Sequence, residues 1–397
     1  MTQAAGAQAA GALLTGAKVV TPGGVLDPGW IRIAGDRIEA VGAGVADGPA
    51  IDLAGQWVLP GFVDIHVHGG GGASFTEGGS DDARRAAEFH RGHGSTRIVA
   101  SLVTAPVDEL AGRCSMLADL ADAGVIDGIH LEGPFLSHAR CGAQDPRYLI
   151  DPDPAAFRRL HAAARGHLKQ ITVAPELPGA TDLIRVVADA GVVAAAGHTD
   201  ASAEVTAAAV DAGVTHATHL FNGMRPLDHR EPGPAGALLD RAGPDGQVSC
   251  EVISDGTHLH DITIRLVARL AQAGNLVLIT DAMAAAGMPD GSYHLGQQAV
   301  TVAGGVARLA EGMPGAGSIA GSTATMAHVV RHAITSAGLQ VTEVAAAAST
   351  TPARIIGLAD TTGALRAGLA ADLVVLDGDF RLRAVMCRGA WVTGQPG

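Results

Sequence analysis

Short apolar segments alternate with amphipathic, alanine-rich stretches through the middle of the chain. The apolar segments contain few polar residues, as is typical of strands that are buried on both faces of a parallel sheet. The pattern predicts eight such strands: Val58–His66, Thr96–Leu102, Gly128–Glu132, Gln170–Glu176, Val192–His198, Thr215–His219, Val248–Ser254 and Asn275–Asp281. Eight strands with intervening helices predict an α/β fold of the TIM (β/α)8 barrel type. An open doubly wound sheet is the alternative, although no GxGxxG motif follows the first strand.

The two ends of the chain show a different pattern, in which short alternating segments are separated by Gly, Pro and Asp. Such segments are typical of antiparallel strands joined by tight turns. We therefore predict a small β-sandwich domain formed by both termini, residues 12–58 and 359–397. A TIM-barrel domain, residues 59–358, would be inserted into it. The polar, glycine-rich segment 282–319 is expected to form a hairpin or a lid after the eighth strand.

Composition and charge narrow the range of partners. The formal net charge is −13 and the chain has only two lysines, Lys18 and Lys169, so neither a nucleic acid nor an anionic membrane is an expected partner. No apolar run reaches the roughly 18 residues of a membrane span. The first charged residue is Lys18, so the start of the chain lacks the basic segment of a signal peptide. The four cysteines are scattered, which favours reduced thiols and a cytoplasmic location.

Histidines and carboxylates are concentrated at the carboxyl ends of the predicted barrel strands. In a TIM barrel these ends converge on one mouth, where side chains from distant sequence positions can meet a single ion. The residues at these positions are His66, His68, Glu132, Glu176, His198, His219, His258 and Asp281. This convergence carries more weight than any single motif.

The pair His66 and His68 is the first candidate for metal binding. The two residues are two apart, so in a strand both side chains point to the same face, and imidazole is an ordinary zinc ligand. The run Gly69–Gly72 that follows would let the backbone approach a ligand closely. Two hydrogen-bonded strand histidines without a metal are the other interpretation.

Glu132 lies in the segment HLEGP, where the chain must leave its strand sharply. It could bind one ion, bridge two, or cap the next helix. Many barrels with two metals use a carbamylated lysine as the bridge, but neither lysine lies at the carboxyl end of a strand, so Glu132 is the natural substitute. His198 and His219 end consecutive strands, and with Glu132 they would form a three-ligand site with an open position.

Three further residues have candidate roles at the same mouth. Asp281 ends an apolar strand, where it could accept a proton from the attacking water and pass it to the leaving group; an N-cap is the weaker alternative, because a loop follows. His258 could contact substrate or make a structural hydrogen bond. Arg230, on the long loop after strand six, suits a phosphate oxyanion, although a surface arginine is the commoner case. His216 is expected to be structural.

Longer motifs surround these candidate residues. They are PGFVDIHVHGGG at 60–71, HLEGPF at 130–135, GHT at 197–199, THLFN at 218–222, REPG at 230–233, SDGTH at 254–258 and TDA at 280–282. Together they resemble the N-acetylglucosamine-6-phosphate deacetylase family of the amidohydrolase superfamily, over nearly the whole chain. The middle motifs are specific to that family, whereas the HxH pair is shared across the superfamily.

The resemblance implies a distorted TIM barrel that hydrolyses the acetamide of N-acetylglucosamine 6-phosphate to glucosamine 6-phosphate and acetate. It also implies a homodimer whose partner subunit helps to hold the phosphate. By matching position, Glu132, His198 and His219 would bind the main metal, and Asp281 would be the acid/base. His66 and His68 are present here, so a second ion can be accommodated, although some members lack this pair and use one metal.

The resemblance also implies a set of substrate-binding residues. They are Asn222, Gly223, Arg230 and His258, and the stretch 141–146 adds Cys141 and Gln144 as further candidates. Arg230 and the backbone around the first two would receive the phosphate, and His258 would touch the sugar. Gln144 stands where some members have a histidine that polarises the carbonyl, and an amide can donate a hydrogen bond but cannot act as an acid. Cys141 is a candidate substrate or metal contact, with an incidental buried thiol as the other interpretation.

The expected cofactor is therefore a divalent metal, with one or two ions per subunit. Zinc is the first expectation, and histidine–carboxylate sites also accept iron, manganese or cobalt. The enzyme alternative is another amidohydrolase, such as a cyclic-amide hydrolase or an N-acyl amino-acid deacylase. A metal-bound scaffold without chemistry is the non-enzyme alternative, but it predicts missing ligands, whereas this chain retains the full set.

Overall fold

The computed structural model describes residues 11–243 and 246–395. The chain divides into two compact units. One contains residues 11–64, 89–97 and 325–395, and the other contains residues 65–88, 98–243 and 246–324. Each unit is built around its own type of sheet.

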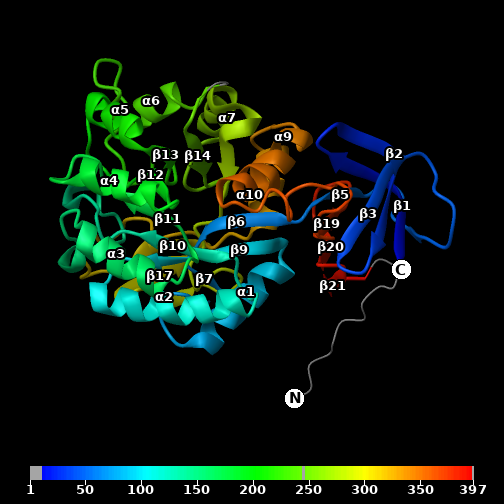
Figure 1. Cartoon of the computed structure of the whole chain (residues 1–397), viewed down its shortest axis with the longest axis horizontal. Coiled ribbons are helices and arrows are strands. Elements are labelled where there is room, and N and C mark those ends of the chain that lie inside the picture. The colour runs from blue at the N-terminus through cyan, green and yellow to red at the C-terminus, as the bar shows by residue number, and fades with distance from the viewer. Residues whose placement is uncertain (1–10, 244–245, 396–397) are drawn as a thin grey trace. The chain divides into compact units, whose positions relative to one another are not determined.

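Eight strands form one parallel sheet (Figure 1). In sheet order they are β6 (Phe62–Val67), β9 (Ser95–Val103), β10 (Gly128–Glu132), β11 (Leu168–Val173), β12 (Val193–Ala196), β13 (Val214–Ala217), β14 (Ser249–Val252) and β15 (Leu276–Leu278). The segment after β15 returns to β6, because Asp281 N donates to His66 O at 2.9 Å and His68 N donates to Ala282 O at 2.8 Å. The sheet is thus a nearly closed barrel, which confirms the predicted TIM-barrel fold.

Helices alternate with these strands along the chain. They are α1 (Ser80–Gly92), α2 (Val107–Asp122), α3 (Pro154–Ala163), α4 (Ala180–Asp189), α5 (Ala203–Ala212), α6 (Gly233–Asp240) and α7 (Asp261–Asn275), followed after β15 by α8 (Met326–Thr335), α9 (Val341–Ala345) and α10 (Thr351–Ile355). Helix α4 illustrates the pattern: it buries Ala180, Leu183, Ile184 and Val187, which lie on one helical face. Ser202 caps α5 by accepting from Val205 N.

A small antiparallel sheet follows β15, where the sequence predicts a hairpin or lid. It consists of β16 (Gly291–Leu295), β17 (Gln298–Ala303) and β18 (Val306–Leu309). Leu295, Val300, Val302 and Leu309 point into one hydrophobic cluster with Val103 of β9. The hairpin is therefore confirmed, and its apolar side anchors it to the rest of its unit.

The terminal segments form the second large sheet. Its strands are β1 (Ala12–Thr21), β2 (Gly24–Ala34), β3 (Arg37–Ala43), β4 (Ile51–Asp52), β5 (Trp57–Pro60), β19 (Leu373–Leu376), β20 (Leu382–Cys387) and β21 (Ala390–Thr393). Strands β5 and β19 are paired, so segments from the two ends of the chain share one sheet. The sheet folds back on itself, because Arg37 Nη1 donates to Gly368 O at 2.7 Å and Ala371 N donates to Asp36 O at 2.8 Å.

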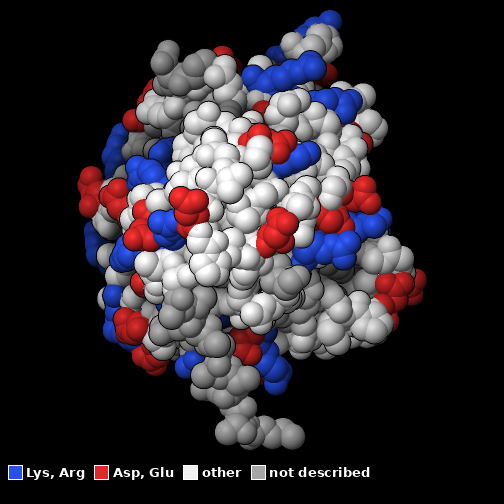
Figure 2. Space-filling model, turned by 90° about the vertical axis from the view of Figure 1, so that its right-hand side faces the viewer, with Lys and Arg blue, Asp and Glu red and all other residues white. Residues whose placement is uncertain are grey.

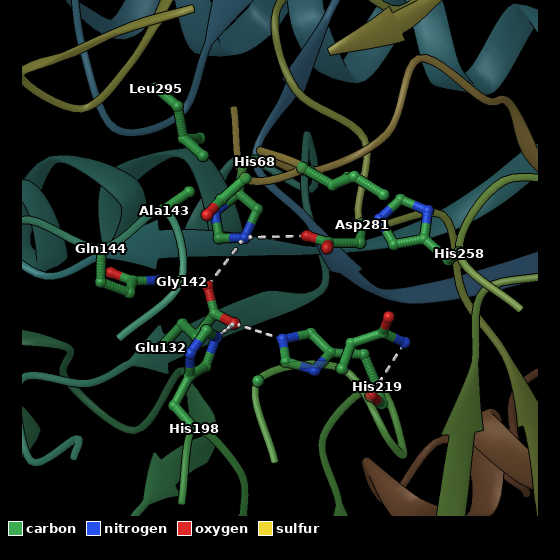
Figure 3. Close-up of a pocket in the computed structure, with 15 residues that line it drawn as sticks. His68, Glu132, Gly142, Ala143, Gln144, His198, His219, His258, Asp281 and Leu295 are labelled. Atoms are coloured by element: carbon green, nitrogen blue, oxygen red, sulfur yellow. Dashed lines mark hydrogen bonds and ion pairs between the residues drawn. The ribbon is translucent and has the colours of Figure 1, made fainter. Parts of the chain in front are cut away.

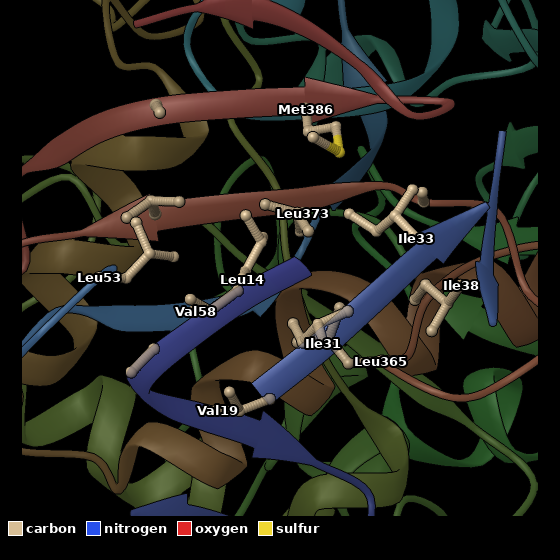
Figure 4. Close-up of a cluster of buried hydrophobic side chains, with 14 residues drawn as sticks. Leu14, Val19, Ile31, Ile33, Ile38, Leu53, Val58, Leu365, Leu373 and Met386 are labelled. Carbon is tan, nitrogen blue, oxygen red and sulfur yellow. The ribbon is translucent and has the colours of Figure 1, made fainter. Parts of the chain in front are cut away.

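Aliphatic side chains fill the interior of this small β domain (Figure 4). The cluster draws Leu14 from β1, Ile33 from β2, Val58 from β5, Leu373 from β19 and Met386 from β20. Burial of such side chains stabilises the fold by roughly 1.5–3 kcal/mol each. The prediction of one β domain made from both termini is confirmed by this shared core.

Helices α8, α9 and α10 belong to the same compact unit as the terminal strands. The predicted boundary between barrel and β domain at residues 358 and 359 stays a prediction. Among the described residues, none of the helices combines the length and the apolar character needed to cross a membrane.

On the face drawn in Figure 2, acidic and basic side chains are interspersed between uncharged areas.

Candidate active site

A pocket of about 310 Å³ lies at the carboxyl ends of the barrel strands (Figure 3). This volume lies within the range of small-molecule sites. The residues that line the pocket are His68, Glu132, Gly142, Ala143, Gln144, His198, His219, Asn222, Gly223, His258, Asp281, Leu295, Ser318, Ile319 and Gly321. Most of them are polar or glycine, so the pocket suits a polar ligand.

Three of these residues adopt an unusual backbone conformation. The predicted strands end at His198, His219 and Asp281, whereas the paired strands end at Ala196, Ala217 and Leu278. The φ angles of His198, His219 and Asp281 are 46°, 24° and 49°. Left-handed φ is uncommon for residues other than glycine and costs of order 1–3 kcal/mol each. The strand ladder therefore stops earlier than predicted, and the strain is concentrated at the residues that form the site.

Glu132, the last residue of β10, lies at the centre of the polar cluster. Its Oε1 is 3.0 Å from His198 Nε2, 2.8 Å from His219 Nε2 and 3.6 Å from His66 Nε2. Its Oε2 is 3.2 Å from His68 Nε2. Four histidines from β6, β12 and β13 and the residues just beyond them therefore converge on one carboxylate, as the barrel prediction requires.

The HxH pair faces the same cluster. His66 Nε2 and His68 Nε2 are 3.2 Å apart, which confirms that both side chains lie on one face. Asp281 Oδ1 lies 3.5 Å from His66 Nε2 and 3.3 Å from His68 Nε2. Asp281 thus approaches the pair from the segment after β15, which lies beside β6 where the barrel closes.

The far ring nitrogens of these histidines face hydrogen-bond acceptors. His68 Nδ1 lies 3.2 Å from Ser101 O, and His198 Nδ1 lies 2.8 Å from Arg140 O. His66 Nδ1 faces a buried carboxylate at 2.9 Å. Because these acceptors require a proton on Nδ1, the Nε2 lone pairs point into the cluster. Two lone pairs that face each other at 3.2 Å need a cation or a proton between them.

The donor atoms fit a divalent cation. Two overlapping groups have ligand atoms within 4.8 Å of one another: His66, His68 and Asp281 form one, and His66, Glu132 and His219 form the other. Ligands about 2.1 Å from one ion lie roughly 3–3.5 Å from each other, close to the separations of this cluster. Imidazole nitrogens and carboxylate oxygens are also the donor set that zinc and related ions prefer.

The charged groups shift one another's pKa. Burial by itself raises the pKa of Glu132, but His66, His198 and His219 outweigh burial and hold it well below the usual range. Burial lowers the pKa of His68, but hydrogen bonds to Asp281 and Glu132 outweigh it and raise the pKa to about 9. Glu132 and His68 thus each favour the charged form of their neighbours.

The predicted substrate residues fall into two groups. Gln144, Asn222, Gly223 and His258 line the pocket. Gln144 Nε2 donates to Glu132 Oε2 at 2.6 Å, so its amide holds the central carboxylate. His258 Nδ1 lies 2.7 Å from Asp255 Oδ2, and although burial alone would lower the pKa of His258, this carboxylate raises it.

Arg230 and Cys141 are not among the lining residues of the pocket. The Arg230 side chain is exposed on the loop after β13. Cys141 is half-buried beside the lining residue Gly142, and burial raises the pKa of its thiol. Their roles in substrate binding therefore stay predictions.

Several residues around the site were not predicted from the sequence. Glu251 of β14 is buried and contacts His66, and Leu295 and Ile319 line the pocket from the segment after β15. Glu251 is an isolated acid inside an apolar run, and this position was the sequence feature that could have indicated a buried, partnered carboxylate. His216 contacts Ser249 and Glu251 rather than the pocket.

This fold and this histidine–carboxylate cluster at the barrel mouth define a metal-dependent hydrolase of the amidohydrolase type. Residues 57–392 match the amidohydrolase family, and the chain belongs to that family. Its members depend on metal, and the clusters described above are candidate metal-binding groups here.

Particular relatives share most of the chain. N-acetylglucosamine-6-phosphate deacetylase of Bacillus subtilis (strain 168) is 34% identical, over 94% of each chain. N-acetylgalactosamine-6-phosphate deacetylase of Escherichia coli O157:H7 is 33% identical, over 96% of this chain and 98% of that protein. A mutant N-acetyl-D-glucosamine-6-phosphate deacetylase from Mycobacterium smegmatis, solved in complex with N-acetyl-D-glucosamine-6-phosphate, is 47% identical, with a TM-score of 0.92 over 97% of this chain and 100% of that chain.

Proposed function

We propose that this protein hydrolyses the acetamide of N-acetylglucosamine 6-phosphate, releasing acetate and glucosamine 6-phosphate. The observation that carries the proposal is the convergence of His198 and His219 on Glu132, with Asp281 beside them, in a polar pocket. The named deacetylases that match nearly the whole chain support the substrate class.

The protein's own residues supply positioning and proton transfer. A divalent cation, when bound by Glu132, His198 and His219, provides Lewis acidity toward the water and the acetyl carbonyl. Asp281 accepts a proton from the attacking water and delivers it to the departing amine. Burial alone would raise the pKa of Asp281, but His66 and its neighbours lower it, so the carboxylate is ionised at neutral pH and ready to act as the base.

The pocket also has candidates for holding the sugar phosphate. His258 lines it and carries a proton favoured by Asp255, so it can donate to a sugar hydroxyl. The backbone around Asn222 and Gly223 offers further contacts on the same wall. Arg230 is the proposed phosphate ligand, although its side chain is exposed and does not line the pocket in this structure. The proposed assembly is a homodimer whose partner subunit helps to hold the phosphate.

The number and identity of the ions form a separate part of the proposal. His66 and His68 with Asp281 make a second group of candidate ligands, so these residues would hold a second ion if one binds. Zinc is the proposed metal, with iron, manganese and cobalt as the competitors that the same donors accept. The proposed location is cytoplasmic.

Acetate release from the phosphorylated sugar, measured beside the metal content of the same sample, tests the function. We expect turnover that chelation abolishes and that added metal restores. Failure to release acetate from the metal-loaded protein would overturn the proposal. Equal cleavage of unphosphorylated N-acetylglucosamine would instead overturn the phosphate assignment and favour another amidohydrolase activity.

The matched variant for the phosphate assignment is Arg230→Ala. We expect it to raise KM for the phosphorylated substrate and to leave the KM for the unphosphorylated sugar unchanged. The Escherichia coli relative is named an N-acetylgalactosamine-6-phosphate deacetylase. N-acetylgalactosamine 6-phosphate is therefore a second candidate substrate. Comparing kcat/KM for the two epimers decides between them.

A further inference from the structure

Glu251 is a buried carboxylate inside the barrel that takes no direct part in the proposed reaction. It lies on β14 with no exposed surface and does not line the pocket. Its Oε2 lies 2.9 Å from His66 Nδ1 and accepts from His219 N at 2.9 Å. One oxygen atom therefore contacts two residues of the proposed metal site.

The contact with His66 decides which ring nitrogen carries the proton. A carboxylate can only accept hydrogen bonds, so Nδ1 is the protonated nitrogen. Nε2 then keeps its lone pair, which points toward His68 Nε2 at 3.2 Å. Metal-ligating histidines depend on such a partner for their tautomer and ring orientation.

The contact with His219 acts through the backbone. His219 has a φ of 24°, a conformation that residues other than glycine rarely adopt. The Glu251 carboxylate holds the N–H of this strained residue, while the ring reaches Glu132 at 2.8 Å. Among the described residues, His219 Nδ1 has no hydrogen-bond partner. The bond to Glu251 therefore fixes the main chain of His219 together with the bond from Asn222 N to His219 O at 2.9 Å.

We propose that Glu251 is a positioning residue that links the two groups of metal ligands. It holds His66, which both groups share, and the backbone of His219 with the same oxygen. This inference rests on the proposed metal site. The new element is that metal affinity depends on Glu251, a carboxylate that contacts the ligand residues but does not itself line the pocket.

The other carboxylate oxygen ties Glu251 to the barrel interior. Oε1 lies 2.9 Å from His216 Nε2, and Gln170 Nε2 donates to it at 3.3 Å. His216 in turn contacts Ser249 Oγ at 2.7 Å. These contacts are also what a carboxylate that only stabilises the fold would make. The experiment must therefore separate the effect of Glu251 on stability from its effect on metal affinity.

The test compares Glu251→Gln with the wild type and with Ser249→Ala. Glu251→Gln keeps the side-chain volume and removes the charge, whereas Ser249→Ala perturbs the far end of the same network without touching a ligand. Metal affinity is measured by competition with a chelator, using Zn²⁺ as the probe. The melting temperature is measured with and without Zn²⁺.

We expect Glu251→Gln to weaken Zn²⁺ binding by about 10–100-fold, as other partners of ligating histidines do, and to shrink the rise in melting temperature that Zn²⁺ produces. Ser249→Ala should lower the melting temperature and keep the affinity. Wild-type affinity in Glu251→Gln would overturn the inference.

If this variant does not fold, Glu251→Asp is the second test, because it keeps the charge but shortens the side chain. It should also bind Zn²⁺ more weakly, and unchanged affinity would overturn the inference. Absence of binding by the wild type would overturn the proposed function instead.

Discussion

The substitution Asp281→Asn separates proton transfer from metal and substrate binding. It replaces one carboxylate oxygen by an amide nitrogen and keeps the shape of the side chain. The amide oxygen can still face His68 and His66, which lie 3.3 and 3.5 Å from Oδ1. The variant should therefore retain the ions but have no group at this position that can accept a proton.

The expected loss follows from the state of Asp281. Its neighbours lower its pKa below the ordinary value, so the base is fully ionised in the wild type at neutral pH and its whole contribution is lost. General acid–base catalysis contributes about 10²–10⁴-fold, which equals about 3–5 kcal/mol in activation free energy at 1.36 kcal/mol per tenfold. We expect kcat to fall by this factor, with a much smaller change in KM.

The assay is acetate release from N-acetylglucosamine 6-phosphate at saturating substrate, with metal content determined on the same protein. Asp182→Asn is the matched control, because Asp182 is an exposed aspartate on α4 that pairs with Arg185. A kcat within tenfold of the wild type, in a variant with wild-type metal content, would refute the assignment of Asp281. Loss of metal together with turnover would show that the defect comes from the ligand group to which Asp281 belongs, and not from proton transfer.

Three further predictions concern stability, pH and specificity. Asp372→Ala should destabilise the protein by about 3–5 kcal/mol in denaturant unfolding, because it leaves the buried Arg97 without the carboxylate that lies 2.8 Å away; a loss below about 1 kcal/mol, the size for an exposed pair, would contradict this. The pKa of His258 is raised and that of Asp255 is lowered, so their pairing stabilises the fold fully between about pH 4 and 6.5 and fades as the pH rises through the folded pKa of His258. Asp255→Asn should flatten this dependence of melting temperature, and identical pH profiles would disprove the pairing. Leu295→Ala removes part of an apolar wall and so enlarges the pocket. It should raise kcat/KM for the N-propionyl relative to the N-acetyl substrate by roughly 10-fold or more. An unchanged ratio would show that the acyl group does not lie beside Leu295.

Local periodicity was sufficient to predict the architecture. Strands buried on both faces appear as continuous apolar runs, and each of the eight runs contributed a strand to one parallel sheet. The first run was wrong in part, because its residues 58–60 belong to β5 and pair with β19 in the terminal sheet. The ends of those runs pointed to Glu132, His198, His219 and Asp281, because parallel strands bring their carboxyl ends to one mouth whatever the loops between them do. The cluster around Glu132 could therefore be predicted from one sequence.

The closure of the barrel determined which residues hold the candidate ligands in place. Glu176 and Glu251 both lie in predicted strands, but Glu176 contacts Thr199 Oγ1 and Asp200 N, whereas Glu251 reaches His66 and His219. Which of two acids meets the ligands depends on strand register and on contacts between residues far apart in the chain. The left-handed backbone at His198 and the exposure of Arg230 depend in the same way on packing. The pattern of the sequence thus specifies which side chains can bind a metal, and the closed barrel specifies which side chains hold them in place, because only closure brings distant strands within hydrogen-bonding distance.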